Sequence, residues 1–107
     1  AGEVSPLAWP ILRTQTEDVL ALPDASALDA MRILAHGIAG DLPVVAGESG
    51  AAAVAGAIAA ALDPAIRSQM RLDENSVVVT IGSAGATYAD TYERVVGKPA
   101  GQIVAAA

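Results

Sequence analysis

The sequence predicts an α/β protein in which a parallel sheet lies between two layers of helices. Three apolar segments of strand length, at positions 18–22, 43–47 and 76–81, alternate with segments of helical periodicity. Alternation of this kind is typical of parallel sheets whose strands are connected by helices. Since three strands make only a thin sheet, we expect the chain to form one edge of a larger three-layer structure.

The N-terminal region predicts a helix followed by a strand. Ser5 and Pro6 form a helix start signal, with a capping side chain followed by proline in the first turn. Pro10 lies within the periodic pattern, so the helix either kinks there or begins later. The run at 18–22 is short, apolar and ended by Pro23, which favours a buried strand. The apolar face of the helix is formed by Leu7, Ile11 and Leu12.

The next stretch predicts a helix over 24–36 and a second strand over 43–47. Apolar residues recur along one face of the helix, and either Gly37 or Gly40 ends it. The strand that follows is the run Pro-Val-Val-Ala-Gly. The apolar face of the helix contains Ala27, Leu28, Met31, Leu34 and Ala35.

The second half predicts three helices and a third strand. The segment 51–62 has almost no polar side, and a helix of that composition is normally buried on both sides. Asp63 and Pro64 start a short helix that runs to Met70. After a polar turn at 73–75, the β-branched run 76–81 is typical of a parallel strand covered on both faces. A last helix is expected from about Ala89 to Val96, and the tail beyond it carries no clear signal.

Charge and composition exclude several classes of function. The net charge is −6, and the six basic residues are scattered, so no positive stripe exists to bind nucleic acid or an anionic membrane surface. The apolar stretch 49–62 is shorter than the roughly 20 residues that span a bilayer. Without cysteine there is no thiol nucleophile and no thiolate metal site, and the one histidine, His36, cannot supply a zinc site by itself. We expect a cytoplasmic protein.

The composition also predicts that the 107 residues are a single segment of a longer protein. Hydrophobic residues make up 53% of the chain, but only 3% are aromatic, and most of the others are small. A core of small residues buries little area per side chain, so it needs a partner surface to complete it. The chain also starts without methionine and without a signal peptide.

Two loops are candidates for a binding site. Positions 47–50 (Gly-Glu-Ser-Gly) and 82–85 (Gly-Ser-Ala-Gly) each follow a predicted strand and open a predicted helix. Ligands of open parallel sheets bind beyond the carboxyl ends of the strands. Glycines allow close backbone approach, and helix N-termini favour acceptors or anions. Each loop alone also fits ordinary turn chemistry, but the pair predicts a shared site containing Glu48 and Ser83.

These motifs resemble a known enzyme family. The stretches 44–51, 73–87 and 2–9 are similar to the C-terminal region of the diaminopropionate ammonia-lyase-like enzymes. Those enzymes are part of the tryptophan synthase β-like, fold type II, group that depends on pyridoxal 5′-phosphate (PLP). The resemblance covers nearly the whole chain and is more specific to the group than to one substrate.

The resemblance implies cofactor-binding roles for five residues. Ser83 matches the hydroxyl that faces the pyridine nitrogen of PLP, and Glu48 matches an acidic residue close to the ring. Gly47, Gly82 and Gly85 would give the ring room beside the backbone. A neutral hydroxyl does not hold the ring nitrogen protonated, which favours elimination at Cβ, since the protein tunes the cofactor's electronics.

The resemblance also implies what the parent protein does. We expect it to remove ammonia from a small amino acid, with 2,3-diaminopropionate as the first substrate to consider, and to act as a homodimer. The Schiff-base lysine and the phosphate-binding loop fall in earlier sequence in this family. Lys98 matches neither of them, so no catalytic residue is assigned here and the segment alone is expected to be inactive. Its partner is then the remainder of its own parent chain.

Two other functions stay open on the sequence alone. A stand-alone α/β module could bind a phosphate or nucleotide at the Gly82–Thr87 loop, although no P-loop lysine-serine pair supports it. A structural or regulatory fragment that associates with a partner would also explain the small-residue core. Tyr88 and Tyr92 are four residues apart, a spacing that favours half-buried packing on one helix face.

Overall fold

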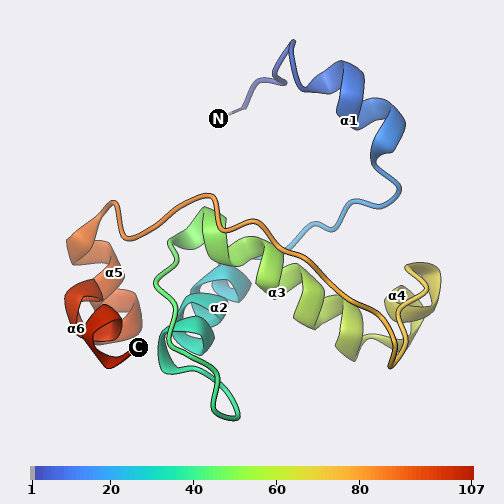
Figure 1. Ribbon diagram of the computed structural model, residues 1–107. Helices are drawn as coiled ribbons and strands as arrows, with labels where there is room; N and C mark the ends of the chain where they lie inside the picture. The colour runs from blue at the N-terminus through green and yellow to red at the C-terminus, as the bar shows by residue number, and fades with distance from the viewer. Residues whose placement is uncertain (1) are drawn as a thin grey trace.

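The computed structural model describes residues 2–107, and these residues form helices joined by extended segments (Figure 1). Two helices dominate the centre, α2 and α3, and the others lie around them. The bounds are α1 Trp9–Gln15, α2 Asp24–His36, α3 Glu48–Leu62, α4 Pro64–Gln69, α5 Ala89–Val96 and α6 Ala100–Ala106.

The predicted parallel sheet is wrong, because residues 2–107 contain no strand. The runs at 18–22, 43–47 and 76–81 are extended, but they do not pair. Gly47 N donates to Ala84 O at 2.8 Å, and in the described chain this is the one backbone hydrogen bond between these runs or their adjoining loops. A strand exists only within a ladder of such bonds. β-Branched residues favour extended backbone, but they do not specify a neighbour.

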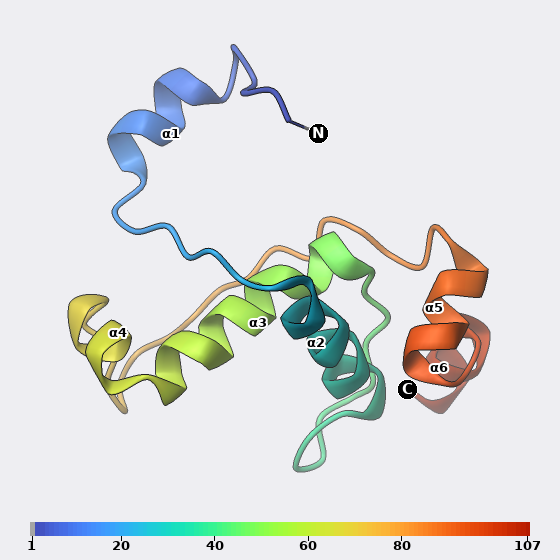
Figure 2. The same ribbon diagram turned by 180° about the vertical axis from the view of Figure 1, so that it is seen from behind.

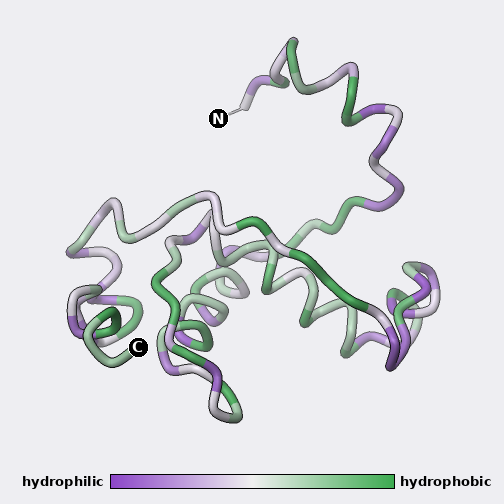
Figure 3. Tube along the Cα trace, viewed as in Figure 1, coloured by the Kyte–Doolittle hydropathy of each residue, from purple (hydrophilic) through white to green (hydrophobic). Residues whose placement is uncertain are grey.

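The third extended run is exposed rather than covered on both faces. Val77, Val79 and Ile81 are 89%, 84% and 79% exposed. In the hydropathy view this run is a green line that crosses α3 on its way to α5 (Figure 3). Apolar side chains that stand this free in water indicate a surface that lacks its covering partner.

The helices follow the sequence more closely. The predictions for 24–36 and 89–96 are confirmed to the residue, and α2 ends at Gly37, whose φ is 71°. Pro10 lies in the first turn of α1, so that helix begins after the start signal rather than kinking. α3 begins at Glu48, three residues before its predicted start. α6 was not predicted, because the C-terminal tail carries no clear helix signal.

The core lies between α2 and α3, which form the largest helix–helix contact (Figure 2). Both helices present alanines there, including Ala30 and Ala35 on α2 and Ala51 and Ala55 on α3. Small side chains let the backbones approach closely but remove little apolar area from water. α3 is buried along one stripe rather than all round, since Ala53 and Leu62 are exposed.

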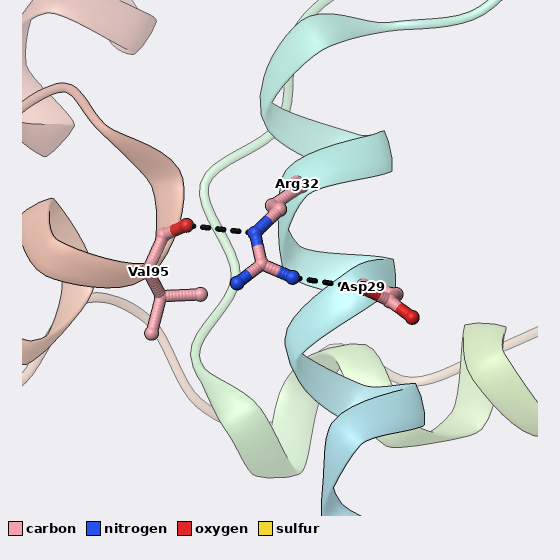
Figure 4. Close-up of polar contacts among 3 residues, drawn as sticks. All are labelled: Asp29, Arg32 and Val95. Carbon is pink, nitrogen blue, oxygen red and sulfur yellow. Dashed lines mark hydrogen bonds and ion pairs between the residues drawn. The ribbon is translucent and has the colours of Figure 1, made fainter.

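α5 is attached to α2 by packing and by one arginine. Met31 on α2 and Tyr92 on α5 are the largest fully buried side chains. Arg32 Nε donates to Val95 O at 2.8 Å, and its guanidinium also pairs with Asp29 at 2.8 Å (Figure 4). A cation at the carboxyl end of α5 interacts favourably with the helix dipole. The arginine therefore fixes how α5 sits beside α2.

The chain is less compact than a typical globular domain of the same length. Its radius of gyration is 15.2 Å, whereas a compact chain of this size has about 13 Å. The accessible surface is 7914 Å², against about 5,500 Å² for a compact monomer of this mass. α1 and the N-terminal residues stand apart from the other helices in both views (Figures 1 and 2).

The side chain of Asp63 caps the N-terminus of α4, and this role can be tested by mutation. The Asp63 carboxylate accepts hydrogen bonds from the backbone N–H groups of Ala65 and Ile66 at 2.9 and 3.2 Å. We expect Asp63→Ala to lower the local stability of α4 by about 0.5–2 kcal/mol. Amide hydrogen exchange at Ala65 and Ile66 measures this loss.

Two variants control for the loss of charge at this cap. Asp63→Asn retains a capping oxygen and is expected to keep most of the protection. Glu74→Ala removes an exposed carboxylate that makes no hydrogen bond among residues 2–107. Equal exchange in Asp63→Ala and Glu74→Ala would contradict the capping role.

Candidate functional site

The two loops singled out by sequence meet at a cavity of about 130 Å³ beside the N-terminus of α3. Its wall is formed by residues 47–49 at the start of α3 and by residues 84–88. Met31 closes it from α2, and Thr91 and Tyr92 close it from α5. Residues that are far apart in the chain thus line one space, but Ser83, predicted to share the site with Glu48, is not among them.

Glycine is what lets the loops approach. A Cβ added to Gly50 would lie 2.5 Å from Ala84 O, and one added to Gly47 would clash with Gly85 O. Gly47 N also donates to Ala84 O. In this structure Gly47 therefore makes room for the backbone of the other loop. At Gly82 and Gly85 an added Cβ would meet no atom within 4 Å, so these two glycines adjoin open space.

The structure gathers three of the five predicted cofactor-binding residues. Gly47, Glu48 and Gly85 line the cavity, whereas Gly82 and Ser83 do not and are exposed. Ser83 directly precedes the wall residue Ala84, so its hydroxyl lies next to the cavity along the chain. Whether these residues bind a cofactor stays a prediction.

The cavity combines apolar walls with a few polar groups. Met31, Ala84 and Ala86 contribute carbon surface. The N-cap of α3 is Gly47, which has no side chain to cap the helix. The first-turn N–H groups of residues 48–50 find no acceptor among residues 2–107, and of these residues Glu48 and Ser49 line the cavity. The exposed Glu48 carboxylate lies in the same turn and is stabilised by the helix dipole.

Tyr92 is the wall residue that sequence reasoning missed. Tyr88, the N-cap residue of α5, and Tyr92, within that helix, differ sharply in exposure. Tyr88 is 79% exposed and Tyr92 only 2%. Burial raises the pKa of the Tyr92 hydroxyl. That hydroxyl is also the buried side-chain polar atom that has no hydrogen-bond partner in the described chain. The four-residue spacing predicted that both side chains would be half-buried, and it did not distinguish them.

A second cavity, of about 330 Å³, lies between the end of α2 and α6. His36, Lys98 and Gln102 line it, and it shares no wall residue with the first cavity. Lys98 is therefore not part of the cavity formed by the two loops. The part of the chain that the structure describes contains no cluster of three side chains able to ligate a metal ion.

Within residues 2–107 no helix has both the length and the hydropathy needed to cross a membrane. The Gly82–Thr87 loop contains no basic side chain, and the α/β architecture assumed for a stand-alone nucleotide module is contradicted by the absence of strands in the described residues.

Comparison with known proteins gives one informative match. The chain is 33% identical over 100 residues to diaminopropionate ammonia-lyase of Salmonella typhimurium, a match that covers 89% of this chain. The chain spans 24% of the length of that relative. No protein-family model matches the sequence. No solved structure matches it either.

Proposed function

We propose that the chain is the C-terminal part of a PLP-dependent ammonia-lyase that acts on a small amino acid, with 2,3-diaminopropionate as the first substrate to test. The observation that carries this proposal is the similarity to a diaminopropionate ammonia-lyase over most of the chain. The meeting of the 47–50 and 82–85 loops at one cavity supports it independently.

The cavity is similar in size to one that holds a six-membered aromatic ring. A cavity of about 150 Å³ lined by apolar side chains is known to hold benzene, and the space here is about 130 Å³. Gly85 and Ala86 line it beside Glu48, which carries a carboxylate. Ser83 lies outside this wall, and its hydroxyl makes no hydrogen bond within residues 2–107.

In this proposal the bound PLP supplies an electron sink for elimination, and the segment supplies one side of its pocket. Met31, Ala84 and Ala86 would supply apolar contacts to the ring. Glu48, and Ser83 as the family resemblance implies, would bind its polar groups. The free N–H groups at the start of α3 present partial positive charge to an acceptor on the ligand.

The covalent lysine and the phosphate contacts come, in this proposal, from the rest of the parent chain. The surface supports that division, since the segment exposes about 2,400 Å² more than a compact monomer of its mass. A stable interface of ordinary size covers only about 800 Å² on each partner. The extra exposed area is about three times what one partner covers in an ordinary interface. An area of that size is expected of a segment that belongs to a larger fold. A homodimeric parent stays a prediction of the family resemblance.

The proposal is tested with the longer polypeptide that carries this segment. We expect it to retain PLP through dialysis and to release ammonia from 2,3-diaminopropionate. A hydrogen bond to a charged group contributes about 1.5–3 kcal/mol, so Glu48→Gln is expected to weaken PLP retention by about 10–100-fold. The fraction of PLP retained, measured by its visible absorbance after dialysis, checks this.

The matched control is Glu74→Gln, which changes an exposed carboxylate in the 73–75 turn. It should leave both PLP retention and ammonia release unchanged. A parent that retains no PLP and releases no ammonia from a panel of small amino acids would overturn the proposed function.

A further inference from the structure

The N-terminal arm of the chain, residues 2–17, contains a helix without a partner. Within the arm only Ala8 is partly buried, and the other residues are exposed. α1 buries none of its residues and stands away from the other helices in both views (Figures 1 and 2). The arm nevertheless exposes large apolar side chains, which belong to Val4, Leu7, Trp9, Ile11 and Leu12. An exposed apolar group of this size indicates an interaction surface.

The base of the arm is attached to the core. Gln69 of α4 donates a hydrogen bond from Nε2 to the Asp18 carboxylate at 3.1 Å. Leu20 and Leu22 lie over Gly56 of α3, where an added Cβ would meet their side chains at ordinary contact distance. The arm therefore projects from a defined place on the α3–α4 side of the segment.

A helix as short as α1 needs contacts from outside itself. It has seven residues, whereas isolated helices shorter than about 12–15 residues are only marginally stable in water. In proteins such helices are stabilised mainly by packing of their apolar face. Leu7, Ile11 and Leu12 form that face here, and Trp9 lies beside Leu12 three positions along the helix. Residues 2–107 leave this face uncovered.

The amount of uncovered surface indicates which partner covers it. The chain spans 24% of the length of the similar ammonia-lyase, so most of that relative has no counterpart here. The segment exposes about 2,400 Å² more than a compact monomer, and an ordinary interface with a second copy would cover only about 800 Å² of it. The rest of a parent polypeptide can cover far more, and its covalent tether keeps it at high effective concentration.

We propose that the arm docks, through Trp9, Ile11 and Leu12, in an apolar groove formed by the rest of its own parent polypeptide. An amphipathic helix that lays its apolar face in a groove is a recurring mode of recognition. Trp9 is the anchor of this contact, because buried tryptophans are among the residues that dominate interface energetics. The inference rests on the proposed function for the existence of a longer parent, and it names the surface by which the segment joins that parent.

The experiment measures amide hydrogen exchange in the longer polypeptide that carries this segment. In a docked arm, exchange requires that the contact opens, so amides 11–16 should exchange at least about 100-fold more slowly than in a synthetic peptide of residues 2–17. Leu12→Ala removes part of the contact while favouring the helix itself. It should raise the exchange rate of these amides by about 30-fold or more.

Arg13→Ala is the matched control at the next position of the same helix. It also introduces alanine, the best helix former, but it removes an exposed charged side chain instead of an apolar one. Loss of its interaction with the helix dipole should change the exchange rate by less than about 5-fold. Equal acceleration by Leu12→Ala and Arg13→Ala would contradict docking through the apolar face.

A photocrosslinker shows whose surface the arm contacts. With p-benzoylphenylalanine in place of Trp9, the product expected on a denaturing gel has the mass of one parent chain and joins the arm to a peptide outside this segment. A product of twice that mass would place a second copy at the arm and overturn the inference. A crosslink confined to residues 18–107, or no crosslink at all, would overturn it too.

The unmodified polypeptide alone keeps the inference falsifiable, whatever happens to the variants. Arm amides that exchange as fast as those of the synthetic peptide would show that nothing covers the arm. These readouts do not involve PLP or ammonia release. A parent that binds no PLP but protects its arm would overturn only the proposed function, and one that retains PLP with an unprotected arm would overturn only this inference.

Discussion

Replacing Gly50 by alanine is expected to destabilise the chain by about 1–3 kcal/mol, the cost of inserting an atom into a packed contact. The new Cβ would lie 2.5 Å from Ala84 O and 3.2 Å from Ala84 N. Both are backbone atoms, so no side-chain rotation relieves the contact. The 84–85 loop has to move away from α3, and the cavity between them changes shape. Urea unfolding followed by circular dichroism measures the loss.

Gly56→Ala is the matched control within the same helix. A Cβ at Gly56 would touch only side-chain atoms of Leu20 and Leu22, at 3.8 and 3.6 Å, which is ordinary van der Waals contact. Alanine is a better helix former than glycine, so Gly56→Ala should stabilise the chain by about 0.5–1 kcal/mol. If both variants shifted stability in the same direction, the close approach of the 84–85 loop would not hold.

The pair also shows how far sequence reasoning went at this site. For Gly50 the sequence predicted only close backbone approach, because spacing does not tell which contact a glycine serves. The structure separates Gly50 and Gly47, which face the other loop, from Gly82 and Gly85, which face open space. The sequence predicted that the two loops would lie together, but not the part played by each glycine.

Helices were predicted well because their signals are local. Asp24 begins α2 and the backbone at Gly37 ends it, and the residues between them repeat at helical spacing. The sheet was predicted wrongly because a strand depends on a partner that composition does not name. Val77 and Val79 indicate extended backbone, and the backbone is extended there, yet no neighbour pairs with it in residues 2–107.

Tyr92 shows a third limit, which concerns burial. Tyr88 and Tyr92 have the same chemistry and lie four residues apart, but only Tyr92 faces α2. The difference arises from where α5 docks on α2, a contact that includes the hydrogen bond from Arg32 to Val95 O. A contact over 63 positions in the chain leaves no periodic signal.

Deletion of the Met31 side chain is expected to have the largest effect on stability, about 2–5 kcal/mol. Most of the buried residues are alanines, and only Met31 and Tyr92 are large and fully buried. A typical domain has about 5–15 kcal/mol of stability in total. The variant Met31→Ala should therefore unfold at a much lower urea concentration and lose the attachment of α5 to α2.

The chain offers its own control, since Met70 is its other methionine and is only partly buried at the end of α4. Met70→Ala removes the same atoms, but it leaves no enclosed cavity, so its cost should fall below about 1 kcal/mol. Equal destabilisation by the two methionine variants would mean that α2 and α5 are not held together at Met31.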